Sequence, residues 1–108
     1  MAKYERQLQG NFDEILRRIC NGVLNGSVSA TLEDSCDWRT PEARCSVRVF
    51  ERYSYTGQNR VSMNVTLFQS GSTVRLCAIT SGGSQATFFK VNTLGEEAFL
   101  DTLRDLFE

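Results

Sequence analysis

The spacing of apolar residues changes twice along the chain, and this change constrains the fold more than any other feature of the sequence. In the first quarter, apolar residues recur at the spacing of one helix face; they are Phe12, Ile15, Leu16, Ile19, Cys20, Val23 and Leu24. Between Val28 and Phe88 they recur instead at every second position, as in half-buried strands. Helical spacing then returns, with Phe99, Leu100, Leu103, Leu106 and Phe107. The pattern predicts a helix at each end of a sheet.

Capping and turn residues set the expected limits of these elements. Asn11 followed by Glu14 is close to a capping box, and it predicts a helix that ends at Gly26 in the left-handed conformation. Thr93 and Glu96 form a second capping box, which predicts a helix that continues to Glu108. We expect an extended arm over 3–8, an acidic loop over 34–44, and strands over 27–33, 45–55, 61–68, 74–78 and 86–90.

Short turns between the strands favour an antiparallel meander. Because each helix must bury its apolar stripe, both helices should pack on one face of that sheet. We therefore expect a two-layer α+β fold with an antiparallel meander sheet of five to six strands, an N-terminal helix and a C-terminal helix. The length of 108 residues predicts a single domain over 1–108.

Composition excludes several classes of function. The chain has no histidine and so lacks the commonest general base and a common metal ligand. Its net charge of −1 provides no bulk attraction for a polyanion. Neither a secretion signal nor an apolar run of the ~18 residues that span a membrane is visible. We expect a cytoplasmic protein with reduced thiols and no membrane contact.

Candidate catalytic groups each have a simpler interpretation. Cys36 is surrounded by acidic residues, which raise the pKa of a thiol and oppose nucleophilic reactivity. The segment Ser81-Gly82-Gly83-Ser84 is typical of a hairpin turn and lacks the residues of a phosphate-binding loop. A serine nucleophile would have only Lys3 or Lys90 as a base. We therefore expect no enzyme, no cofactor and no metal.

Two stretches of the sequence resemble a known family. They are Glu51-Arg52-Tyr53-Ser54-Tyr55-Thr56-Gly57, with Asn59-Arg60-Val61-Ser62 after it, and Ala78 to Ala86, which continues into Phe88-Phe89-Lys90 and into Gly95 to Leu100. Together they resemble a small uncharacterised family of bacterial proteins of about this length, a domain of unknown function. The resemblance covers the whole chain and implies a bacterial, cytoplasmic protein, but it supplies no activity, cofactor or catalytic residue.

The face of the sheet turned away from the helices carries the most informative residues. If Val47 and Val49 face the helices, the opposite parity in each strand faces outward. That outward set contains Arg48, Phe50, Arg52, Phe68, Arg75, Cys77, Ile79 and Phe89. A solvated sheet face is normally polar, and monomers rarely expose a large apolar patch. Two other outcomes are open: strand edges, the loop over 34–44 or the N-terminal arm cover the face, or a register slip exchanges the two faces.

Three functions compete on this basis. The first is a noncatalytic module that forms a homodimer, or binds a protein partner, through the outer sheet face. The second is a small-ligand-binding domain with a pocket between sheet and helices. The third is a single-stranded RNA binder that stacks bases on the sheet, but the chain lacks an RNP-type sequence and a net positive charge. The sequence favours the first.

Overall fold

The computed structural model describes residues 1–54, 59–82 and 89–108, with the backbone alone described for Ser54 and for residues 89–94. Its helices and strands, in chain order, are β1 (Ala2–Leu8), α1 (Phe12–Asn25), β2 (Thr31–Arg39), β3 (Ala43–Ser54), β4 (Asn59–Ser70), β5 (Thr73–Gly82) and α2 (Phe89–Arg104).

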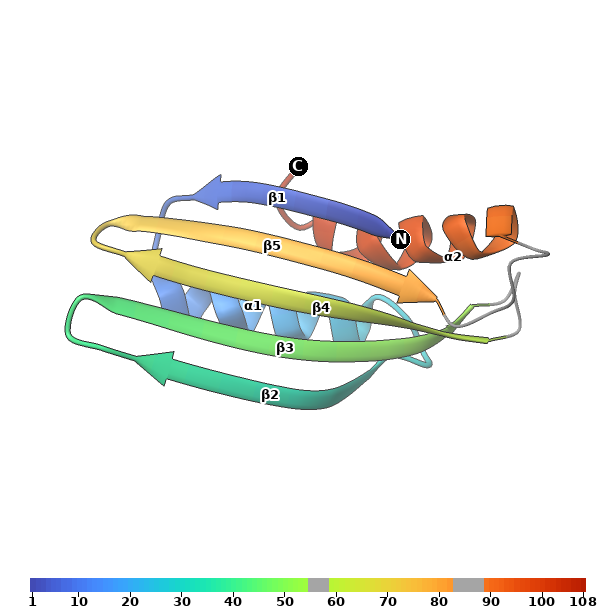
Figure 1. The fold of residues 1–108 in the computed structure, drawn as a ribbon, viewed down its shortest axis with the longest axis horizontal. Coiled ribbons are helices and arrows are strands. Elements are labelled where there is room, and N and C mark those ends of the chain that lie inside the picture. The colour runs from blue at the N-terminus through green and yellow to red at the C-terminus, as the bar shows by residue number, and fades with distance from the viewer. Residues whose placement is uncertain (55–58, 83–88) are drawn as a thin grey trace.

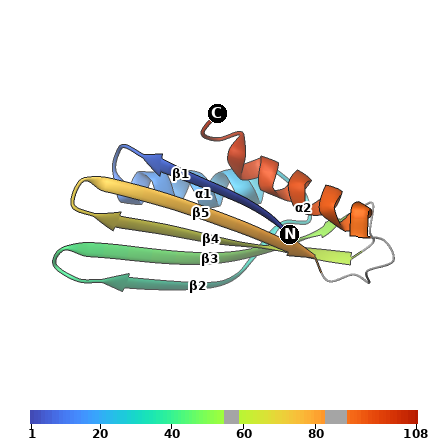
Figure 2. The ribbon, with the colours of Figure 1, turned by 45° about the horizontal axis from the view of Figure 1, so that its top comes forward.

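The strands form one antiparallel sheet of five strands in the order β1-β5-β4-β3-β2. The strands β2 to β5 form a meander, and β1 is added beside β5 as an edge strand. Both helices lie on the same side of this sheet (Figures 1 and 2). The prediction of a two-layer α+β fold is therefore confirmed.

The helix α1 begins and ends where the sequence predicts. The Asn11 side chain accepts a hydrogen bond of 3.0 Å from the backbone N–H of Glu14, which satisfies one of the free amides of the first turn. The predicted left-handed end at Gly26 is wrong, because its φ is −78°. Glycine is favoured there by close packing instead, since a Cβ atom would lie 3.0 Å from the Cβ of Thr102 in α2.

The core lies between the helices and one face of the sheet. The side chains that the two layers bury against each other form a single continuous cluster. It contains Phe12, Ile15, Ile19 and Val23 of α1, Phe99, Leu100 and Leu103 of α2, and Phe50, Val61, Met63, Val65, Leu67, Val74, Leu76 and Ala78 of the sheet. The apolar stripes identified in the two helices thus pack on the sheet.

The expected acidic loop over 34–44 is mostly strand. The strand β2 begins at Thr31 and continues to Arg39, so the strand predicted over 27–33 is displaced along the chain, and Val28 is fully exposed. A tight turn follows, in which the Thr40 amide donates to the Ala43 carbonyl at 2.8 Å. The acidic residues fit a strand because β2 lies at the sheet edge, where charged side chains discourage pairing with other chains.

The helix α2 begins at Phe89, before the predicted capping box at Thr93, and ends at Arg104 rather than Glu108. The strand predicted over 86–90 is therefore wrong at Phe89 and Lys90, and its other residues lie outside the described part of the chain. Two alternating apolar positions, Ala86 and Phe88, are too few to distinguish a strand from the first turn of a helix. Glu96 is not a capping residue; its buried carboxylate accepts a hydrogen bond of 3.0 Å from the Gly82 amide.

The two phenylalanines Phe50 and Phe68 provide a matched test of which sheet face is the core. Phe50→Ala should lower the free energy of unfolding by about 3–5 kcal/mol, because Phe50 is fully buried. Phe68→Ala, at a side chain that is 40% exposed, should lower it by less than about 1.5 kcal/mol. Urea unfolding at about 0.05 µM protein measures both with little contribution from association. Equal losses would contradict the assignment of faces.

Candidate functional site

The face of the sheet opposite α1 and α2, here called the outer face, is the candidate site. Its residues follow from the strand register, since residues paired across strands point to the same side. One row across the sheet joins Gln7, Arg75, Phe68, Cys45 and Trp38. The next two rows join Glu5, Cys77, Thr66, Val47 and Cys36, and then Lys3, Ile79, Asn64, Val49 and Asp34.

Three of the predicted site residues lie on this face. They are Phe68 of β4 with Arg75 and Ile79 of β5, and Phe68 is paired directly with Arg75. Phe68 is 40% and Ile79 is 38% exposed. The structure therefore brings together an aromatic, a cationic and an aliphatic side chain on adjacent strands, as the sequence predicted.

The placement of Arg48, Phe50 and Arg52 on the outer face is wrong. Phe50 pairs with Met63 and Arg52 with Val61, both core residues, so this side of β3 faces the helices. The sequence does not distinguish the two sides of β3, because Val47 and Val49 make one side apolar and Phe50 lies on the other. The register with β4 selects the side that holds the larger side chain, Phe50.

The displaced arginines are held on the helix side by specific contacts. The Arg48 guanidinium lies 3.0 Å from the Asp37 carboxylate, and its side chain is largely covered. The Arg52 guanidinium lies 4.9 Å from the ring centre of Phe99. A hydrogen bond from Ser46, and to a smaller extent one from Arg48, holds the pKa of Asp37 below its ordinary value. These arginines cover the margin of the core and do not belong to the outer face.

Phe89, the remaining predicted site residue, belongs to α2 and not to a strand. Its side chain lies outside the described residues. The structure therefore does not join it to the outer face.

The largest apolar residue of the outer face is Trp38, which is 75% exposed and was not among the predicted site residues. Val47, Val49 and Cys45 also lie on this face, where they are half-buried, although the sequence predicted Val47 and Val49 in the core. Trp38 was hidden inside the segment interpreted as a loop. The alternation of Cys36 and Trp38 with polar neighbours is the signal that would have identified a strand there.

The two segments considered as covers do not lie over the outer face. Residues 34–39 belong to β2, and the N-terminal arm is β1, so both are edge strands within the sheet. Among the described elements, no helix or strand crosses this face (Figure 2). The apolar side chains on it are therefore uncovered by residues 1–54, 59–82 and 89–108.

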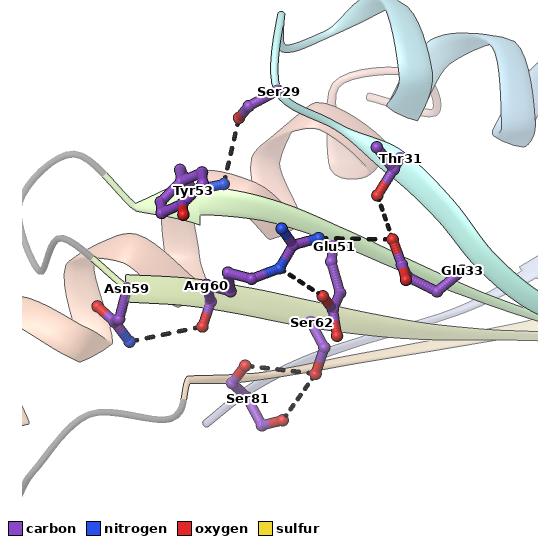
Figure 3. Close-up of polar contacts among 9 residues, drawn as sticks. All are labelled: Ser29, Thr31, Glu33, Glu51, Tyr53, Asn59, Arg60, Ser62 and Ser81. Atoms are coloured by element: carbon purple, nitrogen blue, oxygen red, sulfur yellow. Dashed lines mark hydrogen bonds and ion pairs between the residues drawn. The ribbon is translucent and has the colours of Figure 1, made fainter.

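The outer face has a polar end and an apolar end. At the polar end, Arg60 donates to Glu51 at 2.6 Å and to Glu33 at 3.4 Å, while Ser62 and Ser81 are 3.1 Å apart (Figure 3). These groups satisfy one another, and the pairing with Glu51 raises the pKa of Arg60. The apolar end is the row that contains Trp38, Cys45 and Phe68.

Beside the apolar end, the outer face has a shallow hollow of about 480 Å³. The outward side chains that line it are Glu5, Gln7, Thr66, Phe68, Arg75 and Cys77. A second hollow of about 390 Å³ lies where β1, α1 and the C-terminus meet. In that hollow, Arg18 donates to the Leu106 carbonyl and Arg6 lies 3.6 Å from Glu108, so its cations already have partners within the chain.

The four cysteines are free thiols in different surroundings. Cys36, Cys45 and Cys77 lie on the outer face, and Cys36 is exposed. Cys20 lies on α1, where burial raises the pKa of its thiol and neighbouring Arg48 offsets part of that shift. Burial also raises the pKa of Cys77. Within the described residues, no group of three or more potential ligands is placed to hold a metal ion.

Thiol labelling tests these surroundings. Near pH 8, iodoacetamide should modify Cys36 first, because it is exposed, and Cys20 and Cys77 more slowly, because raised pKa values leave less reactive thiolate. The modification rates of Cys20 and Cys77 should increase with pH, and this increase should occur at a higher pH than for a thiol whose pKa is not shifted. Peptide mapping by mass spectrometry follows each site, and Cys36→Ser should remove the fast reaction. Modification of Cys20 as fast as Cys36 would contradict this arrangement.

Comparison with known proteins places the chain in a family. The model of a family of unknown function, DUF6054, matches residues 1–108. The chain belongs to this family. The match covers all the strands of the outer face, and it confirms the resemblance found in the sequence to an uncharacterised domain. No curated protein and no solved structure matches the chain significantly. The family assignment therefore brings no activity with it, and the function has to be argued from the geometry.

Among the described residues, neither helix combines the length and the apolar character needed to cross a membrane.

Proposed function

We propose that this chain is a noncatalytic module that forms a homodimer by stacking the outer faces of two copies. The observation that carries the proposal is an outer face that no described helix or strand covers, with its exposed Trp38, Phe68 and Ile79. Half-buried Val47 and Val49 of β3 add to this apolar surface, and Thr66 and Asn64 of β4 lie beside them in their rows. Two such faces stacked about 10 Å apart would form a β-sandwich with a second apolar layer.

The size of the outer face suits a dimer of moderate affinity. With five strands and the seven residues of β1, the paired region spans roughly 550 Å² of flat area. Because side chains project from this plane, the accessible area of the outer face exceeds its flat area and comes nearer to the ~800 Å² that each partner buries in a standard interface. Because ordering costs offset much of the apolar gain, we expect a dissociation constant of roughly 1–10 µM.

The charges of the outer face favour a second copy as the partner. On the side of β1 and β5, Lys3 and Arg75 outnumber Glu5. On the side of β2 and β3, the charged residues of the face are Asp34, Glu51 and Glu33, with Arg60 of β4 bound to the two glutamates. One half of the face is thus basic and the other acidic, so the face is complementary to a rotated copy of itself.

The same residues weaken the alternative of RNA binding. Two of the arginines expected on the face, Arg48 and Arg52, lie on the helix side. Arg60 lies on the face but is bound to Glu51 and Glu33. A nucleic-acid platform needs cations that are available to phosphates, and the acidic half of this face would repel them.

We further propose that the module works in the reducing cytoplasm of a bacterium, as the family resemblance implies. Three thiols on the outer face would be exposed to disulfide exchange between copies in an oxidising compartment. The free thiols support this location.

Light scattering tests the proposal. At about 50 µM, above the expected dissociation constant, the protein should have twice the 12.2 kDa mass of the chain. Ile79→Asp should give a folded monomer, because a carboxylate that loses its water shell would replace an apolar contact, and the neighbouring Lys3 already lies 3.4 Å from Glu5. Leu32→Asp is the matched control. The exposed fraction of Leu32 is 43%, similar to the 38% of Ile79, but Leu32 pairs with Phe50 and lies on the helix side of the sheet. It should remain dimeric.

Circular dichroism of each variant shows whether the fold is retained. A particle of 12.2 kDa for the unmodified protein at this concentration would refute the proposal. A dimer dissolved by Leu32→Asp but not by Ile79→Asp would place the interface on the other side of the sheet.

A further inference from the structure

We infer that the two copies are related by a two-fold axis parallel to the strands, so that Trp38 of each copy enters the hollow beside Arg75 of the other. This inference rests on the proposed function and specifies its geometry. It assigns Trp38, Arg75, Lys3 and Asp34 to the interface as contacts between copies.

The two ends of the outer face differ in polarity. Trp38, Cys45 and Phe68 form a row at one end, and Thr31, Glu51, Ser62 and Ser81 lie at the other. An axis across the strands would stack the apolar end of one copy on the polar end of the other. An axis parallel to the strands and along β4 keeps each end over its own counterpart. Phe68 then meets Phe68 of the other copy, Val47 meets Cys77, and Val49 meets Ile79.

The outer face carries a projecting side chain, Trp38, near one edge and a hollow near the opposite edge. Trp38 projects from edge strand β2 with 75% of its surface exposed. The hollow of about 480 Å³ lies across the sheet at the same level, where Gln7 and Arg75 continue the row that begins with Trp38. The strand β4 lies midway between them.

A two-fold axis along β4 exchanges the two sides of the sheet. It places β2 of one copy over β1 of the other and β3 over β5. Trp38 then faces the hollow of the partner, and the contact occurs twice. Stacked sheets lie about 10 Å apart, a gap that an indole from one sheet and an arginine from the other can close together.

The chemistry of the hollow suits an indole. Arg75 is exposed and can place its guanidinium over the indole face, and Phe68 provides an apolar wall. Tryptophan and arginine are also the residues that most often dominate the affinity of protein interfaces.

The same axis pairs the charges of the third row. Lys3 on β1 and Asp34 on β2 belong to one row that runs through Ile79, Asn64 and Val49. Exchange of the two sides places Lys3 of each copy over Asp34 of the other. Lys3 also lies 3.4 Å from Glu5 in its own strand, but both side chains are exposed and such a pair is weak.

A charge exchange between copies tests the axis. Lys3→Asp and Asp34→Lys should each weaken the dimer by about tenfold, because each brings like charges together at two symmetric contacts. A mixture of the two variants should recover the affinity of the unmodified protein as a heterodimer, since the exchanged charges then attract. If either substitution weakened the dimer by disturbing the fold of the monomer, mixing the two variants would not restore the affinity. Sedimentation velocity measures all three samples.

A truncation tests the indole. Trp38→Ala should weaken the dimer by at least about thirtyfold, as for a dominant interface residue. Tyr53→Ala is the matched control, because Tyr53 is also an exposed aromatic residue of the outer face but pairs with Arg60 at the polar end. It should leave the affinity within about twofold.

The outcomes separate this inference from the proposed function. If the unmodified protein is a monomer at about 50 µM, the proposed function fails. If a dimer forms and Ile79→Asp dissolves it, but Trp38→Ala has no effect and mixing the charge variants restores nothing, the outer face is the interface and the axis is overturned. Loss with Trp38→Ala together with recovery on mixing establishes the arrangement.

Discussion

The pairing of Phe50 with Met63 across β3 and β4 determines how the rest of the sheet is used. It places Phe50 in the core and turns Val47 and Val49 to the opposite side, because a shift of one residue would exchange every side chain of the strand. The arginines of β3 then cover the margin of the helix layer, where Arg44 pairs with Asp13 at 2.9 Å and Arg48 with Asp37. The apolar residues Val47 and Val49 thus lie on the outer face because Phe50, on the other side of β3, fills the core.

Both helices lie on one side of the sheet, so the apolar residues on the other side have no partner among the described elements (Figure 2). Such a patch has a cost in water that a second sheet would remove. The charges separate along the same face, with Lys3 and Arg75 toward β1 and Asp34 and Glu51 toward β2. A face that is apolar at one end and oppositely charged at its two sides is complementary to its own copy, which is the physical basis of the proposed dimer.

Much of the fold was predictable because its signals are local. The cap at Asn11 and the stripe of α1 follow from neighbouring residues, as does the alternation of β4. The face assignment of β3 was not predictable, since both parities are apolar and only pairing with β4 distinguishes them. The strand at Trp38 was hidden by acidic residues that suit a loop and an edge strand equally. Of the candidate site, Phe68, Arg75 and Ile79 were found, and Trp38, Val47 and Val49 needed the register.

In the proposed dimer the outer face, and not the helix side, contacts a second copy. Methyl NMR spectra recorded over a dilution series test it directly. If two copies stack through the outer face, methyl signals of Val47, Val49 and Ile79 should move as the protein is diluted, while those of Val61, Val65 and Val74 in the core should stay fixed. Signals that move only on the helix side, such as those of Leu16 and Leu24, or signals that do not move at any concentration, would contradict it.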